Sequence, residues 1–289
     1  MNPNNHSYKL IDSGDGRKLE AVGPYILDRP SSAALWKKSK APSFWQQADA
    51  RFERTSSQKG VWTLKKNQKI PGKWLVSLGS TKVWAKLTDF GHIGIFPEHH
   101  RDYPWLPLIE KRHQEGKEIK VLNLFAYTGA LSLTLSSLGA EVVHVDGSKA
   151  AIEWGKENQL QQSSAPGRVR WILDDVTKFV KREVRRNSKY HGIVLDPPSF
   201  GRGPKSEVWK IEDNLPELLQ DLKKLLAKDY CFTQLSSHSQ YHSPICLGNV
   251  LSSYMGEVGG KVESFEMTVE EQAGRRLLPA GSCAIYMNS

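Results

Sequence analysis

Short apolar runs alternate with amphipathic stretches along the chain from residue 120 onward. The apolar runs are 121–125, 141–146, 169–173, 192–196 and 230–235, and the helical stretches are 130–138, 149–161 and 214–227. Strands that alternate with helices of this length are joined by crossover connections, which bring successive strands side by side in parallel. The pattern therefore predicts an α/β fold with a mainly parallel sheet.

The last part of the chain breaks this alternation. Two extended segments, 262–269 and 282–287, follow each other with no long helix between them. Strands joined by a short connection pair antiparallel, because the chain has to turn back on itself. We therefore expect the sheet to close with an antiparallel last strand.

The first part of the chain is rich in Trp and in turn residues. Its strand-like runs are 61–64, 74–78 and 83–88. The pair Gly79-Ser80 between two of these runs predicts a hairpin turn, and residues 33–49 have a helical pattern. We expect a small β-rich region over residues 1–107 and a larger α/β domain over residues 108–289.

The composition narrows the class of function. The chain has 40 Lys and Arg against 31 Asp and Glu, a formal charge of +9, which favours a polyanionic partner without identifying it. The start of the chain is polar and no apolar run reaches membrane-spanning length, so we expect a cytoplasmic protein without membrane association. The three cysteines form no close-spaced pair, which argues against a disulfide framework and against a zinc site.

A single glycine follows the first predicted strand of the α/β part, in the pair Thr128-Gly129. A dinucleotide needs several glycines at this point, because its pyrophosphate approaches the backbone closely. One glycine is enough only to turn the backbone into the next helix. The pattern therefore predicts a ligand without a pyrophosphate.

Carboxylates end the next two predicted strands. Asp146 follows the second strand, where it can accept hydrogen bonds from both ribose hydroxyls. The pair Asp174-Asp175 follows the third, placed to accept a hydrogen bond from the exocyclic amine of adenine, and Asp175 is the residue assigned to it. An Asp at such a position is also a common helix N-cap, so each signal is weak alone. Taken together and in order, they predict an adenosine ligand without phosphates, namely S-adenosylmethionine.

The fourth predicted strand runs into Asp196-Pro197-Pro198-Ser199-Phe200. Each proline fixes its φ angle and removes an N–H donor, so the loop presents carbonyl and carboxylate acceptors in a set shape. Such a loop can hold an amine or a base edge, and the Phe200 ring offers a face for a flat base. The alternative is a structural turn with a packing aromatic. Because an adenosine site is predicted upstream, we favour a catalytic role for Asp196, Pro197, Pro198 and Phe200.

These motifs resemble those of a known enzyme class. The run 123–129 with Asp146, Asp175 and the Asp-Pro-Pro-Ser-Phe loop resembles the class I S-adenosylmethionine-dependent methyltransferases. More closely, it is similar to the bacterial family that methylates bases of large-subunit ribosomal RNA, over roughly residues 91–288. The resemblance implies a Rossmann-like sheet, methyl transfer from S-adenosylmethionine, and ribosomal RNA as the substrate.

The same resemblance implies a set of residues that bind the cofactor. They are Phe96, Glu98, Asn123, Phe125, Tyr127, Thr128, Gly129, Asp146, Ser148, Asp175 and Asp196. Phe96 and Glu98 belong to an upstream strand signature and are implied to close over the cofactor. Lys205, Glu207 and Trp209 are implied to lie at the rim of the substrate site.

The chain departs from the family after the fifth predicted strand. Cytosine-5 methyltransferases carry a nucleophilic cysteine there, whereas this chain has Ser236-Ser237-His238-Ser239, with Ser237 in place of the thiol. A thiolate adds to a pyrimidine ring, but a serine hydroxyl does not without a dedicated base. This favours a nitrogen, oxygen or guanine-type acceptor, with Asp196 orienting an amine or accepting a proton. His238 is either a base or a hydrogen-bonding surface group.

Three further features have an ordinary structural interpretation. The basic side chains Lys178, Lys181, Arg182, Arg185 and Lys189 recur at helical spacing, which favours a solvated helix face over a stripe that follows phosphates. His99 and His100 have no carboxylate or cysteine cluster at ligand spacing, so we expect surface side chains and no metal. The first hundred residues hold too few predicted strands for a complete RNA-binding domain.

Two other functions stay open at this stage. The acceptor could be a protein or a small molecule instead of RNA, or the chain could be a non-catalytic RNA-binding protein that retains the fold. The presence of Asp146, Asp175 and Asp196 argues against a non-catalytic protein, because a decayed site would be expected to lose them. A homo-oligomer is also left open.

Overall fold

The computed structural model describes residues 7–56, 59–100, 103–163, 167–256, 260–272 and 276–288. The chain forms two compact units. One unit comprises Met1–His100 with Thr268–Ala280, and the other comprises Arg101–Met267 with Gly281–Ser289. The division expected at residue 107 stays a prediction. The returning segment Thr268–Ala280 makes the first unit discontinuous in sequence, which no local pattern indicated.

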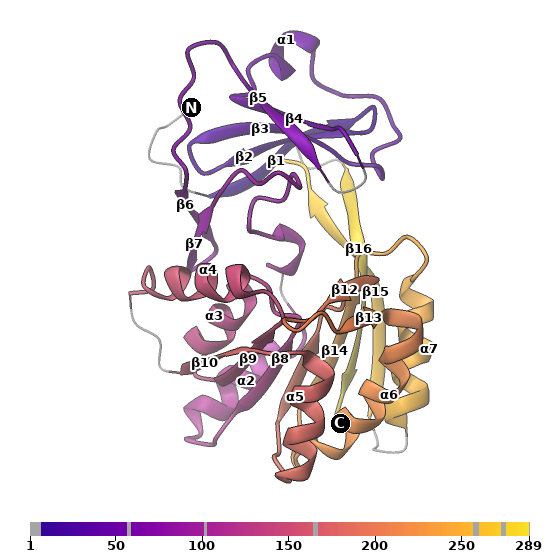
Figure 1. Cartoon of the computed structure of the whole chain (residues 1–289). Helices are drawn as coiled ribbons and strands as arrows, with labels where there is room; N and C mark the ends of the chain where they lie inside the picture. Colours follow the sequence, from indigo (N-terminus) through magenta and orange to yellow (C-terminus); the bar gives the residue numbers. More distant parts are fainter. Residues whose placement is uncertain are drawn as a thin grey trace. The chain divides into compact units, whose positions relative to one another are not determined.

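The second unit holds the seven-stranded sheet, whose strand order is β10-β9-β8-β11-β14-β16-β15 (Figure 1). Its strands are β8 (Lys120–Leu124), β9 (Glu141–Asp146), β10 (Arg168–Leu173), β11 (Gly192–Leu195), β14 (Phe232–Ser237), β15 (Lys261–Glu270) and β16 (Leu277–Met287). The first five of these pair in parallel, and β16 pairs antiparallel with β14. The predicted α/β class, with a mainly parallel sheet and an antiparallel last strand, is confirmed.

Six helices in the described part of the second unit connect and cover these strands. They are α2 (Leu106–Gln114), α3 (Ala130–Ser137), α4 (Lys149–Gln159), α5 (Val176–Arg185), α6 (Ile211–Lys224) and α7 (Pro244–Met255). None of the described helices is long and apolar enough to cross a membrane.

Two apolar cores lie on opposite faces of the sheet, because successive side chains of a strand point to opposite sides. On β8, Leu122 belongs to the core that packs with α5, α6 and α7, whereas Val121 belongs to the core that packs with α2 and α3. In the second core, the rings of Trp105 and Phe232 stack with centroids 4.7 Å apart. The buried indole of Trp105 donates to Gln234 Oε1 over 2.8 Å. Burial on both faces explains why β8, β9 and β11 are predominantly apolar.

The first unit is built around a five-stranded sheet of order β1-β2-β3-β4-β5. The strands are β1 (Tyr8–Gly14), β2 (Arg17–Val22), β3 (Tyr25–Pro30), β4 (Ala50–Arg54) and β5 (Gly60–Leu64), and a separate hairpin consists of β6 (Trp74–Leu78) and β7 (Thr81–Ala85). The predicted hairpin turn is confirmed, because Leu78 pairs with Thr81 and Gly79 adopts a φ of 59°. The expectation of too few strands was wrong, because the described part of the first hundred residues contains the seven strands β1 to β7.

The helix expected over residues 33–49 is absent, and only α1 (Pro42–Trp45) forms there. A contact with a residue distant in sequence explains why the longer helix does not form. The buried carboxylate of Asp12 on β1 accepts the backbone N–H groups of Ser39 and Lys40, which a helix would have used internally. Pro42 also lacks an N–H donor and favours a helix start at its own position.

Asp12 connects the returning segment to the first sheet. Its side chain is fully buried and accepts hydrogen bonds from Trp45 Nε1 and from Arg276 Nη2, over 2.9 Å and 2.8 Å. Burial raises the pKa of this carboxyl, but the hydrogen bonds from Ser39, Lys40 and Trp45 outweigh burial and hold the pKa below its usual value. The group is therefore ionised at neutral pH and paired with Arg276.

We predict that Asp12→Asn lowers the free energy of unfolding of the first unit by about 3 kcal/mol, because it removes one of the two carboxylates that pair with Arg276 and replaces a buried acceptor oxygen by a donor. Urea denaturation of the full chain measures the loss. The control is Asp15→Asn, which removes a half-exposed carboxylate that pairs with the exposed Lys37 and should cost less than about 0.5 kcal/mol. Equal losses in the two variants would contradict the assigned role of Asp12.

Candidate active site

Five loops follow the carboxyl ends of the parallel strands of the second unit, at one edge of the sheet (Figure 1). Ligands of open α/β sheets bind at this edge, because the loops diverge there. The sequence-predicted residues of the second unit lie on or beside these loops, after β8, β9, β10 and β11.

The loop after β8 has an unusual backbone. Phe125 and Tyr127 adopt left-handed φ angles of 55° and 50°, and Gly129 follows at 80°. Aromatic residues rarely adopt this conformation, so neighbouring contacts must hold it, as is common in binding loops. Of these three left-handed positions, the sequence indicates only Gly129 as a turn. A Cβ on Gly129 would lie 2.5 Å from the Trp171 ring.

Asp146 holds this loop from the neighbouring strand. Its two carboxylate oxygens accept the backbone N–H groups of Tyr127 and Ser148, each over 2.8 Å. Burial raises the pKa of this carboxyl, and the two N–H donors oppose that shift. Each carboxylate oxygen has a second lone pair, so the group can still accept from two ribose hydroxyls.

Two predicted cofactor residues act as helix N-caps. The Ser148 hydroxyl accepts from Ala151 N at the start of α4, and Asp175 Oδ1 accepts from Lys178 N at the start of α5. Asp175 Oδ2 makes no hydrogen bond among the described residues, so one oxygen can serve a ligand while the other caps the helix. The helix-cap interpretation of Asp175 is therefore observed and is compatible with binding of adenine.

Two other predicted residues point into the protein. Asn123 is 3% exposed and donates from Nδ2 to the Ser132 hydroxyl over 2.8 Å, and that hydroxyl lies 2.9 Å from His144 Nδ1. Thr128 is 2% exposed, and its carbonyl accepts from Asn158 Nδ2. The Asn123 side chain thus connects β8 to α3 and the Thr128 carbonyl connects the loop to α4, and these positions give no support for side-chain contact with a ligand.

The loop after β11 brings polar atoms and an aromatic ring to the same sheet edge. Asp196 Oδ1 accepts the Ser236 hydroxyl over 2.7 Å, and Asp196 Oδ2 lies 3.4 Å from His238 Nε2. Pro197 is buried, Pro198 is exposed, and the Phe200 ring is 55% exposed. Ser236 was not predicted as a site residue, because it lies forty residues after Asp196 and no local pattern indicates their contact.

The Trp209 side chain is buried against this loop and does not lie at the rim of the site. It is 5% exposed, packs on Phe125 with ring centroids 4.7 Å apart, and donates from Nε1 to the Pro198 carbonyl over 2.7 Å. The Pro198 carbonyl, one of the acceptors expected of this loop, is therefore hydrogen-bonded within the protein. The rim position implied for Trp209 was wrong, because the hairpin of β12 (Phe200–Arg202) and β13 (Val208–Lys210) turns its ring inward.

The same hairpin reaches back to the loops after β9 and β10. A Cβ on Gly147 would lie 3.5 Å from the Cα of Gly203, and a Cβ on Gly203 would lie 3.1 Å from Asp175 Oδ2. Glu207 accepts from Lys178 Nζ on α5 over 2.7 Å, which holds the hairpin in this position. The hairpin is therefore part of the wall around the predicted adenosine site.

Phe96 and Glu98 belong to the first unit, and their role at the cofactor stays a prediction. Glu98 is 7% exposed, and the Phe96 ring contacts the rings of His92 and His99. The surface position expected for His99 was wrong, because His99 is 8% exposed. His100, which follows the turn Pro97–His99, is half-buried, and burial lowers its pKa to about 4.

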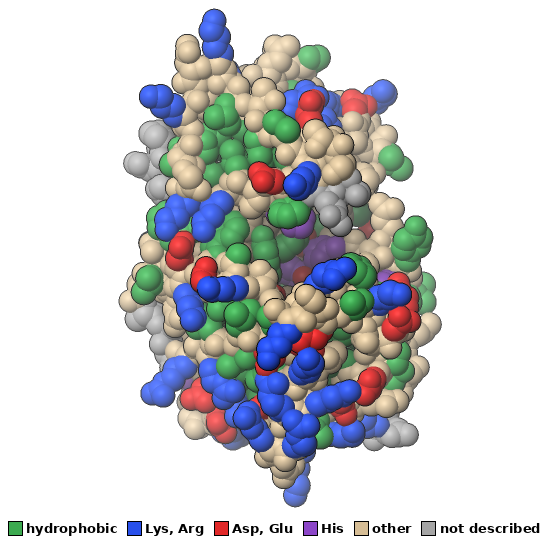
Figure 2. All heavy atoms as spheres, viewed as in Figure 1, with side chains coloured by type: hydrophobic (Ala, Val, Ile, Leu, Met, Phe, Trp, Pro, Cys, Tyr) green, Lys and Arg blue, Asp and Glu red, His purple; other side chains and the backbone are tan. Residues whose placement is uncertain are grey.

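Three of the five basic side chains named for the stretch 178–189 pair with acids within the protein. Lys178 pairs with Glu207, Lys181 pairs with Glu217 over 2.8 Å, and Arg182 pairs with Asp174. Figure 2 shows Lys and Arg side chains gathered over the lower part of the view, with some acidic side chains between them. These pairs support the solvated-face interpretation of α5 over a stripe for phosphates.

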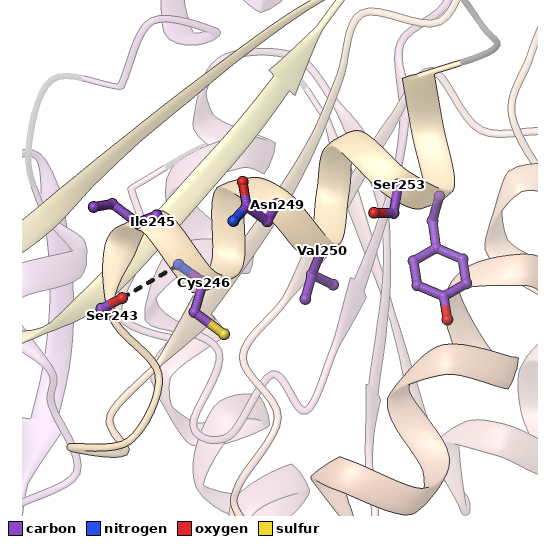
Figure 3. Close-up of a pocket in the computed structure, with 7 residues that line it drawn as sticks. Ser243, Ile245, Cys246, Asn249, Val250 and Ser253 are labelled. Carbon is purple, nitrogen blue, oxygen red and sulfur yellow. Dashed lines mark hydrogen bonds between the residues drawn. The ribbon is translucent and has the colours of Figure 1, made fainter.

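A separate hollow lies along α7 (Figure 3). Its lining consists of Ser243, Ile245, Cys246, Asn249, Val250, Ser253 and Tyr254. The lining contains no carboxylate, no histidine and none of the predicted site residues. This hollow therefore lacks the carboxylates that follow the strands of the parallel sheet.

Comparison with known proteins agrees with this geometry. Residues 107–233 match the model of a family described as S-adenosylmethionine-dependent methyltransferase. The solved S-adenosylmethionine-dependent methyltransferase of Agrobacterium tumefaciens is 37% identical with a TM-score of 0.91, and the match covers 98% of this chain and 90% of that chain.

Two curated relatives are named for ribosomal RNA. The ribosomal RNA large subunit methyltransferase K/L of Hahella chejuensis is 30% identical over 61% of this chain and 23% of its own length. Large subunit methyltransferase K of Neisseria meningitidis is 26% identical over 75% of this chain and 61% of its own length. The chain thus spans less than two thirds of either relative.

The solved structure carries the family assignment, because it is similar over nearly its whole length. The enzyme class and the cofactor predicted from the sequence are thereby confirmed. The chain belongs to the S-adenosylmethionine-dependent methyltransferases.

Proposed function

We propose that this enzyme methylates a base of RNA, with large-subunit ribosomal RNA as the acceptor and the cytoplasm as its place of action. The observation that carries the proposal is the loop after β11. Asp196 offers a carboxylate held in one orientation, and the exposed Phe200 offers a ring on which a flat base can stack. The names of the two curated relatives support the same acceptor.

The residues at the strand ends suit the cofactor that the family uses. Asp146 and Asp175 each retain acceptor capacity for an adenosine, and the loop after β8 lacks the glycines that a pyrophosphate requires. Bound there, S-adenosylmethionine supplies a methyl group on a sulfonium, which is already activated for displacement.

The protein's own contribution to the reaction is orientation. Asp196 would hold an N–H of the acceptor base and Phe200 would stack on its ring, so that the acceptor atom faces the methyl group. In a displacement the methyl–sulfur bond breaks while the bond from methyl to acceptor forms. The absence of a thiol at Ser237 supports an acceptor that needs no covalent intermediate, such as a nitrogen.

The distribution of charge supports a polyanionic acceptor. The first unit carries 18 Lys and Arg against 10 Asp and Glu, a formal charge of +8, while the second carries 22 against 21, a charge of +1. The segment 65–73 of the first unit has four lysines and no acid, and all four are exposed. Clustered lysines without acids attract phosphates and release counterions on binding. We therefore propose that segment 65–73 contacts the RNA backbone.

Transfer of radiolabelled methyl groups tests the proposed acceptor. Wild-type enzyme should label deproteinised large-subunit ribosomal RNA isolated from cells that lack the enzyme, and Asp196→Asn should label it at least 100-fold more slowly. Total protein and small metabolites are offered in parallel reactions. Label in either of those pools, and none in the RNA, would overturn the RNA proposal in favour of that acceptor.

We predict that Asp146→Asn weakens S-adenosylmethionine binding about 10- to 100-fold, measured by calorimetry. The amide has an NH2 donor in place of one acceptor oxygen, and this donor faces the backbone N–H of Tyr127 or Ser148. The contact with the ribose is weakened, and the conformation of the loop after β8 is destabilised. The control is Asp174→Asn, which changes the acid beside Asp175 that pairs with Arg182. Equal weakening in the two variants would remove Asp146 from the proposed site.

We predict that replacing Lys65, Lys66 and Lys69 together by Ala weakens RNA binding at least 10-fold near physiological salt. The slope of log affinity against log salt should become shallower by about 2, since each lost phosphate contact removes roughly 0.7 from it. Fluorescence anisotropy with a labelled RNA fragment measures both quantities. Replacing Lys111, Lys117 and Lys149, which pair with glutamates of the second unit, is the matched control and should leave the slope unchanged.

A further inference from the structure

The two serines that end β14 are neighbours with different partners. Ser236 is fully buried, and its hydroxyl donates to Asp196 Oδ1 over 2.7 Å. The Leu195 carbonyl lies 3.2 Å from the same hydroxyl. Because a hydroxyl has one proton, the shorter and charge-assisted bond to Asp196 is the stronger of the two.

The other oxygen of Asp196 faces a histidine. His238 Nε2 lies 3.4 Å from Asp196 Oδ2, and the imidazole is one third exposed. Gly281 on β16 makes room for this ring, because a Cβ there would lie 3.3 Å from His238 Nδ1 and 2.8 Å from the Ser237 carbonyl. Both carboxylate oxygens of Asp196 therefore have a neighbour from the end of β14.

Ser237 has other partners than Asp196. It is 1% exposed, its hydroxyl lies 2.9 Å from His242 Nδ1, and it accepts the backbone N–H of Ser239 over 3.2 Å. These contacts hold the turn that follows β14. The serine in the place of the family's thiol therefore has a structural partner, while the serine before it contacts the reacting end.

We propose that Ser236 is a positioning residue for methyl transfer, and that His238 assists it by fixing the second oxygen of Asp196. The torsion that rotates a carboxylate about its last bond is broad, so an unsupported Asp would present its lone pairs in many directions. The buried hydroxyl selects one carboxylate plane and aims the remaining lone pairs at the acceptor. This inference rests on the proposed function, because it assigns Asp196 to the acceptor.

The matched pair Ser236→Ala and Ser237→Ala tests the inference. Both variants remove one hydroxyl from adjacent buried positions of one strand, so a similar melting temperature is expected. Ser236→Ala should lower kcat for RNA methylation about 10- to 100-fold, the range for losing one hydrogen bond to a charged group, and Ser237→Ala should lower it less than 3-fold. The dissociation constant of S-adenosylmethionine should change less than 2-fold in both.

A double-mutant cycle separates positioning from general damage. In an Asp196→Asn background, Ser236→Ala should cost little further activity, because the group that it positions has already been altered.

His238→Ala should lower kcat about 10-fold, which is less than the Ser236 effect, since its contact to Asp196 is longer. Ser236→Thr, which retains the hydroxyl, should recover activity relative to Ser236→Ala.

Three outcomes would overturn the positioning role: equal kcat losses in Ser236→Ala and Ser237→Ala, additive losses with Asp196→Asn, or a loss of cofactor affinity that accounts for the change in rate. Failure of the proposed function has a different signature. Wild-type enzyme would then bind S-adenosylmethionine and transfer no methyl group to RNA.

Discussion

The hydrogen-bonded pairing of β8 with β9 on one side and β11 on the other is the constraint on which the rest of the site depends. Leu124 pairs with Val145 and with Leu195, so all three strands end within one residue of each other. Parallel strands in register bring their following loops to one edge. Asp146 and Asp196 are fifty residues apart in sequence and become neighbours of the same loop after β8 only through this register.

The loop after β8 is then shaped by contacts from its neighbours. Left-handed backbone at two aromatic residues costs free energy, of order 1–3 kcal/mol at each position. Asp146 offsets part of this cost by accepting Tyr127 N–H, and the buried Asn158 of α4 donates to the Thr128 carbonyl of the same loop. Residues that the family resemblance groups as cofactor-binding thus divide into those that can face a ligand and those that keep the loop in shape.

The sequence predicted the sheet because apolar runs of strand length alternate with helices, a periodicity that is local. It failed where a distant residue decides the local conformation. The helical pattern of residues 33–49 yields to the carboxylate of Asp12, which takes the N–H groups of Ser39 and Lys40. Trp209 and His99 were placed at the surface from sequence, but a hairpin and a tight turn direct them inward. A single chain pattern contains no information about such side-chain partners.

The sequence by itself determined the fold class, the enzyme class and the cofactor, because these follow from strand order and from short motifs that directly end strands. Only the tertiary structure decided which oxygen of Asp175 caps a helix, that Ser236 and not Ser237 contacts Asp196, and that the basic side chains Lys178, Lys181 and Arg182 are paired with acids. The physical reason is common to all three. A hydrogen bond or ion pair forms within about 3 Å in space, and sequence distance does not report that separation.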